Sequence, residues 1–303
     1  MPHAGKVLII ANPTAKNGAA AAAARRAAGL LRAQLGEARV DVALTQAPRH
    51  ATELAARASG YATVCALGGD GLVHEMVGGL LQRPAAQRPA LGVLPQGSGN
   101  DYARALGISF SLERACEQFL AAQAVPTDVG RVNGECFAET LSFGVDAAIA
   151  LDTVQRRVRT GRTGTILYLE AGIDQMLHHL EERPYVASFD SGQPVRAGSI
   201  TFAVQVGPYY GGGFKICPDA RLDDGLLDVC ISHPPLSVPR AVYIFLRAKN
   251  GSHTGFAQVE LLRASRLHLE FDAVPPAQVD GERIKATTFD IEVLPGALQV
   301  LRP

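Results

Sequence analysis

The sequence predicts a two-domain α/β protein, with a doubly wound parallel sheet in the first domain and a mostly antiparallel sheet in the second. Three observations support this prediction. At 303 residues the chain exceeds the usual size of one domain. Short apolar runs alternate with helical patterns up to about residue 125, which is typical of a parallel sheet. Beyond that point strand-like runs follow one another, and Gly, Pro and Asp separate many of them.

In the first domain the expected strands and helices alternate along the chain. Apolar runs predict strands over residues 7–11, 40–44, 63–67 and 91–94. Alanine-rich or periodic stretches predict helices over residues 19–35, 51–58 and 72–81, and another that starts near residue 100. Because ligands of such sheets bind outside the carboxyl ends of the strands, the loops at these ends are the first places to look for a site.

In the second domain the sequence predicts strands and one helix. The strands are expected over residues 127–132, 136–143, 184–190, 199–206, 226–232, 259–262, 266–271 and 283–293. The helix is expected over residues 165–180, with one apolar face formed by Ile166, Leu169, Ile173, Met176, Leu177 and Leu180. We expect this face to pack in the core; a wall that faces lipid is the alternative.

Composition excludes some classes of function. Lys+Arg and Asp+Glu both number 29, so the chain has no overall field to attract nucleic acid, and we expect no nucleic-acid partner. The five cysteines form no CxxC pair, which argues against a zinc cluster or disulfide framework and favours a reducing cytosol. No apolar run approaches the ~20 residues that span a bilayer. We expect a cytoplasmic protein that contacts the inner membrane surface only transiently if its substrate is a lipid.

Three loops at the ends of predicted strands have unusual compositions. Residues 68–71 (Gly-Gly-Asp-Gly) connect a strand to a helix; glycines adopt positive φ or bring the backbone close to a ligand, and a helix N-terminus binds phosphate. Residues 94–101 (Leu-Pro-Gln-Gly-Ser-Gly-Asn-Asp) again connect a strand to a helix, with capping oxygens at the end. Residues 11–18 (Ala-Asn-Pro-Thr-Ala-Lys-Asn-Gly) contain Lys16, whose side chain is long enough to reach a nucleotide phosphate if one binds at this edge. The spacing matches neither a Walker loop nor a dinucleotide fingerprint.

Together these loops resemble the catalytic domain of the diacylglycerol kinase superfamily, which includes sphingosine, ceramide and soluble bacterial lipid kinases. The family's Gly-Gly-Asp-Gly-Thr motif with its following Asn-Glu is similar to residues 68–75, and its Pro-x-Gly-Thr-x-Asn-Asp motif to residues 95–101. The resemblance continues through residues 128–130, 143–147, 211–213, 218–228 and 279–282, and so covers nearly the whole chain.

The resemblance implies a fold like those of NAD kinases and diacylglycerol kinases. The nucleotide-binding α/β domain then covers residues 1–125, joined by about 294–303, and a β-sandwich acceptor domain covers 126–293. The resemblance also implies ATP and Mg²⁺ as cofactors and a lipid alcohol as substrate, with a diacylglycerol-like acceptor favoured. A homodimer is left open.

The resemblance also implies roles for individual residues. Asp70 lies near the nucleotide phosphates and magnesium, Asp128 is a second carboxylate of the site, and Glu282 activates the acceptor hydroxyl as a base. A solvated turn acid is the alternative for each of the three. The residues expected to contact the nucleotide are Asn12, Pro13, Thr14, Lys16, Gly68, Gly69, Gly71, Glu75, Gly97, Ser98, Asn100, Asp101 and Arg104.

Two charged segments have further candidate roles. The acidic residues 218–228 resemble a structural magnesium site of bacterial family members, with Asp223, Asp224 and the Leu226 carbonyl as ligands. An acidic hairpin is the alternative. A basic cluster is suited to ATP phosphates, to an anionic membrane or simply to solvent. Its members are Arg156, Arg157, Arg159 and Arg162.

Two positions depart from the family pattern. Leu72 stands where the family usually has Thr, and His74 where it has Asn, while Glu75 is kept. The lost hydroxyl removes a hydrogen bond to phosphate. Two alternatives to a lipid kinase therefore stay open: a kinase of a soluble acceptor, as in the NAD kinases, and a catalytically weakened regulator that binds nucleotide or lipid.

Overall fold

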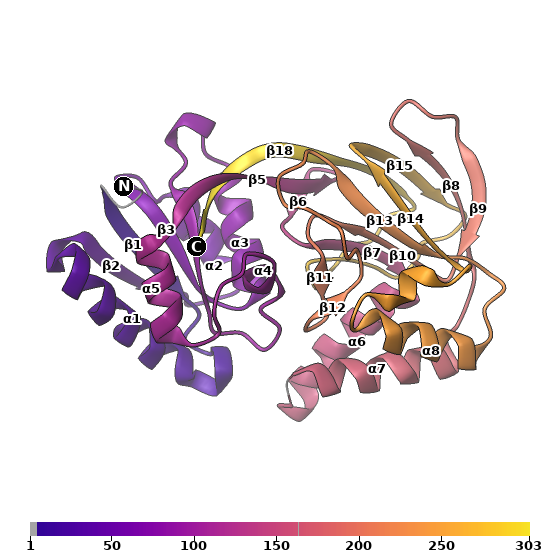
Figure 1. Cartoon of the computed structure of the whole chain (residues 1–303), viewed down its shortest axis with the longest axis horizontal. Helices are drawn as coiled ribbons and strands as arrows, with labels where there is room; N and C mark the ends of the chain where they lie inside the picture. The colour runs from indigo at the N-terminus through magenta and orange to yellow at the C-terminus, as the bar shows by residue number, and fades with distance from the viewer. Residues whose placement is uncertain (1–4, 163) are drawn as a thin grey trace. The chain divides into compact units, whose positions relative to one another are not determined.

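The computed structural model describes residues 5–162 and 164–303, without the side chains of Lys16 and Asn17. The chain divides into two compact units (Figure 1). The first unit contains the chain up to Val129 and returns for Pro295–Pro303; the second contains Gly130–Leu294. The first is a mixed α/β unit and the second is mostly antiparallel, so the predicted fold class is confirmed.

The first unit is built on a parallel sheet. Its strands lie in the order β2–β1–β3–β4, and the last part of β18 lies next to β4, with Val300 opposite Leu91. The strand bounds are β1 (Lys6–Ala11), β2 (Val40–Leu44), β3 (Tyr61–Gly68), β4 (Ala90–Pro95) and β18 (Thr288–Arg302). The carboxyl ends of β1, β3 and β4 therefore lie along one edge of the sheet.

Helices connect these strands, as the alternating pattern predicts. Their bounds are α1 (Ala19–Leu35), α2 (His50–Ala56), α3 (Asp70–Leu81), α4 (Asp101–Ala105) and α5 (Leu112–Ala121), with short 3₁₀ turns η1 (Ala15–Gly18), η2 (Glu37–Arg39) and η3 (Ala85–Gln87). The alanine-rich face of α1 is buried, since Ala20, Ala24, Ala27 and Ala28 have almost no exposed surface. Small side chains on this face let the helix lie close to the sheet. The sequence did not predict α5.

The second unit packs two antiparallel sheets around an aromatic core. One sheet has the strand order β14–β13–β10–β7–β16–β17; the other contains the first part of β18 with β15, β8 and β9, and β5 and β6 pair beside it. Phe143 from the first sheet packs its ring against Phe289 and Phe271 from the second, at centroid distances of 4.7 and 5.2 Å. These rings fill the space between the sheets, as in a β-sandwich.

The strand bounds of this unit differ from the prediction in several places. They are β5 (Gln123–Val132), β6 (Glu135–Phe137), β7 (Thr140–Gly144), β8 (Arg183–Phe189), β9 (Val195–Ser199), β10 (Thr201–Gln205), β11 (Tyr209–Tyr210), β12 (Phe214–Lys215), β13 (Leu227–Ser232), β14 (Val259–Ala264), β15 (Arg266–Phe271), β16 (Ala277–Val279) and β17 (Glu282–Arg283). The single strand predicted over 283–293 is wrong, because β17 ends at Arg283 and β18 begins only at Thr288.

The expectation of one helix in this unit is also wrong. The structure has α6 (Val145–Thr160), α7 (Thr165–His178) and α8 (Val238–Ala248), with a 3₁₀ turn η4 (Ser252–Gly255). Among the described residues no helix combines the length and apolarity that a membrane crossing requires.

The predicted core face of α7 is confirmed only in part, because Met176 is buried and Leu169 and Leu180 pack against the core, whereas the other three predicted residues are exposed. The side chains that are buried belong to Leu167, Tyr168, Ala171 and Met176. Tyr168 packs on Phe214, at a ring centroid distance of 5.0 Å. By contrast, Ile166 and Leu177 keep 66% and 55% of their surface exposed. The helix is apolar on both sides, so periodicity alone could not identify the side that packs inward.

Candidate functional site

Two glycine loops meet at the carboxyl edge of the parallel sheet. Gly69 follows β3 and Gly97 follows β4, and the Gln96 amide donates to the Gly68 carbonyl at 2.7 Å. A Cβ atom added to Gly69 would lie 2.8 Å from the Gly97 Cα, and one added to Gly97 would lie 2.3 Å from the Gly69 Cα. Neither position has room for a side chain, so the two loops pack backbone against backbone.

Space, rather than unusual backbone geometry, explains these glycines. Gly69 has φ −105°, and Gly68, Gly71 and Gly97 also lie outside the left-handed region. A Cβ on Gly68 would lie 2.6 Å from the Leu72 Cδ2, so Leu72 packs directly over Gly68. A Cβ on Gly71, in contrast, would meet no atom within 4 Å. The protein itself does not fill the space beside Gly71.

Asp70 and Asn100 hold the two loops in place. Asn100 has φ 57° and closes its own loop, because its Oδ1 accepts from the Gly97 amide at 2.7 Å and its Nδ2 donates to the Gly97 carbonyl at 3.0 Å. The Asp70 Oδ1 accepts from the Tyr102 amide at the start of α4, at 3.3 Å. The predicted residues Gly68, Gly69, Asp70, Gly97 and Asn100 are therefore brought together in one structure.

A second carboxylate lies next to Asp70. Carboxylate oxygens of Asp70 and Asp101 are within 4.8 Å of one another, and Asp101 is buried. The Arg104 Nε lies 3.6 Å from the Asp101 Oδ1, and its guanidinium also lies over the Phe110 ring. Arg104 therefore has partners within the protein. Ser98, by contrast, lies in the loop between Gly97 and Asn100 and is exposed.

The other predicted nucleotide contacts lie in different surroundings. At the end of β1, the Asn12 Oδ1 accepts from the amide and the hydroxyl of Thr14, at 3.0 and 2.8 Å, next to Pro13. The side chain of Lys16 lies outside the described part of the structure. The Glu75 Oε2 accepts from the Ala51 amide at the start of α2, at 3.1 Å. Glu75 thus has a structural partner away from the glycine loops.

Asp128 stabilises the entry of the last strand into the first unit. It is buried, and its Oδ1 accepts from the Gly296 amide at 2.7 Å. Gly296 has φ 55°, a left-handed conformation that glycine adopts at little cost. At least one Asp128 oxygen therefore has a structural role.

Glu282 belongs to the second unit and follows a tight hairpin turn. Asp280 and Gly281 connect β16 to β17 with φ values of 45° and 91°, as a two-residue turn requires. The Asp280 carboxylate accepts from the amides of residues 138, 139 and 140, at 2.7, 3.1 and 2.8 Å. The Gly281 amide donates to the Gln278 Oε1 at 2.6 Å. Hydrogen bonds hold the turn on both sides, so the backbone at Glu282 is held in place.

Sequence reasoning missed the acid next to Glu282. Carboxylate oxygens of Glu135 and Glu282 lie within 4.8 Å of one another. Glu135 starts β6 after a turn whose residues Asn133 and Gly134 both have positive φ. No motif marks Glu135, and its proximity to Glu282 follows only from the tertiary structure, since the two residues lie on β6 and β17 in different sheets.

The predicted metal site lies beside an arginine. The Asp224 Oδ1 accepts from the Leu226 amide at 3.2 Å, and Asp223 lies 3.6 Å from Arg221. The Arg263 Nε lies 2.9 Å from the Asp228 Oδ1, and its Nη1 lies 3.9 Å from Asp224. The Arg263 guanidinium therefore lies beside these acids, which belong to a connection between β12 and β13 that is not a hairpin, because the two strands do not pair. A metal on Asp223, Asp224 and the Leu226 carbonyl stays a prediction.

Two of the four basic residues on α6 and its following loop have acidic partners. Arg156 pairs with Asp152 at 2.8 Å and with Asp174, and Arg162 pairs with Glu170 at 2.6 Å.

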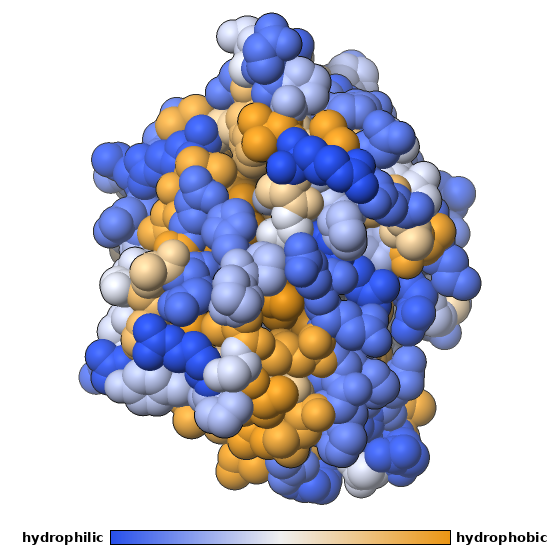
Figure 2. Space-filling view, turned by 90° about the vertical axis from the view of Figure 1, so that its right-hand side faces the viewer, coloured by the Kyte–Doolittle hydropathy of each residue, from blue (hydrophilic) through white to orange (hydrophobic). Residues whose placement is uncertain are grey.

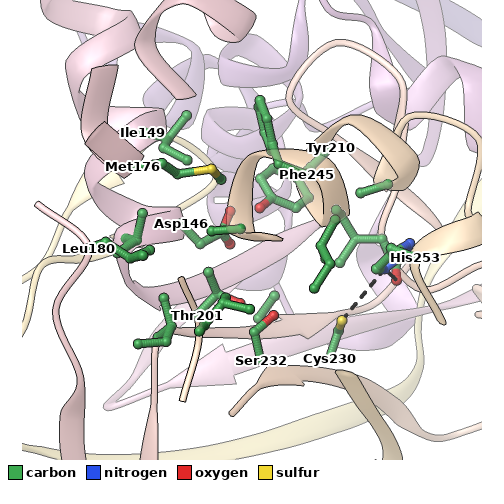
Figure 3. A pocket seen from close by; sticks show the side chains of 18 of the residues that line it. Asp146, Ile149, Met176, Leu180, Thr201, Tyr210, Cys230, Ser232, Phe245 and His253 are labelled. Atoms are coloured by element: carbon green, nitrogen blue, oxygen red, sulfur yellow. Dashed lines mark hydrogen bonds between the residues drawn. The ribbon is translucent and has the colours of Figure 1, made fainter. Parts of the chain in front are cut away.

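The second unit contains an apolar pocket beneath its helices. Helices α6, α7 and α8 and strands β10 and β13 line it (Figure 3). The pocket has a volume of about 60 Å³, whereas one water requires roughly 10–15 Å³ measured in the same way. Most of its lining is aliphatic or aromatic, and Asp146 lies among these residues (Figure 3). An apolar pocket with few polar groups is typical of a site for an organic ligand.

Burial makes Asp146 a weak acid. It is the second residue of α6, where a helix N-terminus favours the ionised form. Burial nevertheless raises its pKa from 3.8 to about 7, although a hydrogen bond from Ser142 acts in the opposite direction. Removal from water therefore dominates over the helix and the hydroxyl.

The raised pKa predicts a pH-dependent stability. Between about pH 4 and 7 the folded protein holds a proton on Asp146 that the unfolded chain releases, so the free energy of unfolding falls as pH rises. Asp146→Asn has no carboxyl group that must ionise in the core. It should therefore raise the free energy of unfolding above that of the wild type by roughly 2–4 kcal/mol at pH 8 but not at pH 4. Urea unfolding of both proteins at the two pH values measures the effect. Equal differences at pH 4 and pH 8 would contradict a raised pKa.

Comparisons with known proteins extend these findings. A family model described as "Diacylglycerol kinase catalytic domain" matches residues 6–132, and one described as "YegS C-terminal NAD kinase beta sandwich-like domain" matches residues 139–302. A Pseudomonas aeruginosa protein named "Probable lipid kinase YegS-like" is 32% identical over 82% of this chain and 79% of its own length. An Enterobacter protein of the same name is 29% identical over 80% and 79%.

Solved structures share the fold. A diacylglycerol kinase from Bacillus anthracis str. Sterne superimposes with a TM-score of 0.76 over 99% of this chain and 97% of its own, at 22% identity. An NAD kinase from Archaeoglobus fulgidus superimposes with a TM-score of 0.53 over 98% and 92%, at 11% identity. At these identities the likeness concerns architecture alone.

Proposed function

The chain belongs to the diacylglycerol kinase-like superfamily of lipid kinases, and from that premise we propose that it transfers the γ-phosphoryl group of ATP to the hydroxyl of a lipid alcohol. A diacylglycerol-like acceptor is the first to test. The observation that carries the proposal is the backbone contact between Gly69 and Gly97, with Asp70 beside it and open space at Gly71. Phosphoryl transfer needs such close, oriented approach to the phosphates rather than covalent chemistry by the protein.

The carboxylates divide the remaining tasks. Asp70 and Asp101 would hold Mg²⁺, since their oxygens lie within 4.8 Å and hard cations prefer carboxylate oxygens. When bound, this ion neutralises charge on the phosphates. Glu282 would accept the proton of the lipid hydroxyl, because a carboxylate on a fixed turn is suited to a general base. Asp128 would act as a positioning residue through Gly296.

The apolar pocket of the second unit supports a lipid rather than a soluble acceptor. Its lining provides hydrocarbon contacts from Ile149, Tyr168, Leu180 and Phe245 among others. Such a lining stabilises a bound nucleotide or sugar only a little. The binding free energy of an aliphatic tail, in contrast, becomes more favourable with each CH₂ group that the pocket buries.

Transfer of labelled phosphate from ATP tests the proposal. The acceptors are diacylglycerol, a sphingoid base, phosphatidylglycerol, glycerol and NAD, each with magnesium and detergent. We expect label on at least one lipid and none on glycerol or NAD. Label on NAD alone would replace the lipid kinase with a soluble-acceptor kinase. Nucleotide binding without any transfer would instead indicate a regulator.

Gly71 offers a test of phosphate binding that leaves the fold intact. A Cβ at Gly71 or at Gly78, in the same helix, meets no atom within 4 Å. Alanine favours a helix over glycine by up to about 1 kcal/mol, so neither Gly71→Ala nor Gly78→Ala should destabilise the protein. We expect Gly71→Ala to weaken ATP binding by about 10-fold, or about 1.4 kcal/mol, because the methyl group fills space that a phosphate needs. Calorimetric titration measures this; equal affinities of the two variants would remove Gly71 from the nucleotide site.

We also propose that this protein contacts the membrane surface, and that it does so through α6 and α7. Val158, Ile166 and Leu177 keep 83%, 66% and 55% of their surface exposed, and Arg157 and Arg159 lie on the same helical pair. Figure 2 shows apolar surface gathered toward the lower end of this face, where α7 and α8 lie in Figure 1. Apolar side chains flanked by cations are typical of surfaces that bind anionic bilayers.

Glutamate substitutions test this placement. The double variant Ile166→Glu/Leu177→Glu should lower sedimentation with vesicles of phosphatidylglycerol and phosphatidylcholine by about 10-fold, because two charges replace apolar contacts. Val195→Glu on β9, an equally exposed apolar position, is the matched control and should leave vesicle binding unchanged. If the control lowers binding as much as the double variant, the contact is elsewhere.

A further inference from the structure

A row of polar side chains crosses one sheet of the second unit. The strands β14, β13, β10 and β7 lie side by side (Figure 1). Their register places one member of the row on each strand, in the order Arg263, Asp228, Gln205 and Thr140. Residues directly opposite one another on antiparallel strands lie on the same face of the sheet. Asp228, Gln205 and Thr140 are buried, so the row leads from Arg263 into the core.

Asp228 is the carboxylate of this row, and Arg263 is its counterion. The Asp228 Oδ1 accepts from the Arg263 Nε at 2.9 Å. The Asp228 Oδ2 and the Gln205 Oε1 have no hydrogen-bond partner among the described residues. A half-turn of the Gln205 amide changes this, because the Thr140 hydroxyl, now 2.6 Å from the amide nitrogen, then donates to the amide oxygen. The nitrogen is thereby free to donate to the neighbouring Asp228, and the row needs no further cation.

The remaining nitrogens of Arg263 contact the connection between β12 and β13. The Nη2 donates to the Asp219 carbonyl at 2.8 Å, and the Nη1 lies 3.9 Å from the Asp224 Oδ2. The other oxygen of Asp224 accepts from the Leu226 amide at 3.2 Å. One guanidinium therefore joins three points of residues 218–228 to β14, and it lies beside both Asp224 and Asp228.

This arrangement fits a guanidinium and does not fit a divalent metal ion. Mg²⁺ and Ca²⁺ need about six or more oxygen ligands that converge on one point. Among the described residues, no three acids of residues 218–228 bring their carboxylate oxygens within 4.8 Å of one another. A divalent ion on Asp224 would also lie close to the positive charge of Arg263, which repels it.

We propose that Arg263 takes the place of a structural metal in this protein, as a built-in cation that neutralises Asp224 and Asp228 and ties residues 218–228 to β14. The segment should then keep its structure when divalent ions are removed. Loss of the guanidinium would instead leave two carboxylates and the Asp219 carbonyl without a cation, and such oxygens are the ligands that hard divalent ions prefer. Arg263→Met should therefore make this segment respond to magnesium or calcium.

The proposal goes beyond the proposed function and does not depend on it, because neither nucleotide nor lipid takes part. Hydrogen exchange of the full chain, measured by mass spectrometry in EDTA, in magnesium chloride and in calcium chloride, tests it. Peptides from residues 218–232 report on this segment itself, so that an ion bound at Asp70 is not mistaken for one bound here.

We expect exchange of the wild-type segment to differ by less than about 2-fold among the three conditions. In EDTA, Arg263→Met should exchange at least about 10-fold faster than the wild type, because buried Asp228 loses its counterion. Magnesium or calcium should restore most of this protection. Arg266→Met is the matched control, since Arg266 lies on the following strand β15 and pairs with Glu292 at 3.9 Å. Its segment 218–232 should exchange as in the wild type.

Three results would overturn the proposal. The first is wild-type exchange that either ion slows by about 10-fold, because the segment then binds a metal beside Arg263. The second is exchange of Arg263→Met in EDTA at the wild-type rate. The third is fast exchange of Arg263→Met that neither ion slows, which would make Arg263 an ordinary ion-pair partner. If Arg263→Met does not fold, Arg263→Lys keeps the charge without the fork of donors. It should exchange at an intermediate rate without responding to either ion, and a response would count against the proposal.

Discussion

Asp70→Asn should lower ATP turnover by at least about 10³-fold, because the change removes the charge that would hold the metal at the phosphates. The asparagine Oδ1 can still accept from the Tyr102 amide, so the loops should keep their arrangement. Alanine would also remove that capping hydrogen bond, at a cost of about 1 kcal/mol, which makes asparagine the better test. Steady-state release of ADP with the best lipid acceptor measures the effect.

Asp41→Asn is the matched control for Asp70→Asn. Asp41 is also a carboxylate of the first unit, and it accepts from the Tyr61 hydroxyl on β3 at 2.9 Å. Its loss should leave turnover within about 3-fold of the wild type, because it lies on β2 and not in a glycine loop. Turnover of Asp70→Asn that matched this control would remove Asp70 from the mechanism.

Glu282→Gln should lower kcat by about 10²–10⁴-fold and change the KM for ATP by less than about 3-fold, since a general base acts in the transition state. The turn should persist, because Asp280 and the Gly281 amide make its anchoring hydrogen bonds. Rapid-quench measurement of the first turnover separates the chemical step from product release.

The neighbouring acid decides whether the base is assigned correctly. Carboxylate oxygens of Glu135 and Glu282 lie within 4.8 Å of one another, so Glu135 is a second candidate for the general base. We expect Glu135→Gln to lower kcat by less than about 10-fold. A larger loss in Glu135→Gln than in Glu282→Gln would transfer the role of base to Glu135, and a pure rise in the ATP KM would assign Glu282 to nucleotide binding.

Local signals predicted the first unit well. Strands 40–44 and helix 19–35 agree with β2 and α1 to the residue, because apolar runs and alanine-rich stretches are strong local signals. The helices α6 and α8 were missed. In α8, Val, Tyr, Ile and Phe follow one another, and these residues favour strands locally. In the folded protein the packing of one apolar face stabilises a helix instead. In α6 the first residues were assigned to one motif and the arginines to a separate basic cluster, so a single continuous helix was not predicted.

The candidate site was likewise predictable only in part. The three loops were predictable because each follows a strand of a parallel sheet. The contact between Gly69 and Gly97, the partner of Asp128 at Gly296 and the proximity of Glu135 to Glu282 were not, because each depends on how distant segments pair. The same holds for Arg263, which meets Asp228 from 35 positions away. Sequence patterns mark residues that matter, but only tertiary structure shows which other residues they touch.

The path of β18 has a consequence for synthesis of the protein on the ribosome. The first unit lacks its strand beside β4 until residues 295–303 have been made, because these residues come after the whole second unit. Through that interval one side of β4 exposes unpaired amides and carbonyls, which can pair with other nascent chains. The first unit is therefore completed only when the last residues of the chain have been made, and loss of residues 295–303 should destabilise this unit before the second one, although the second unit precedes them directly in sequence.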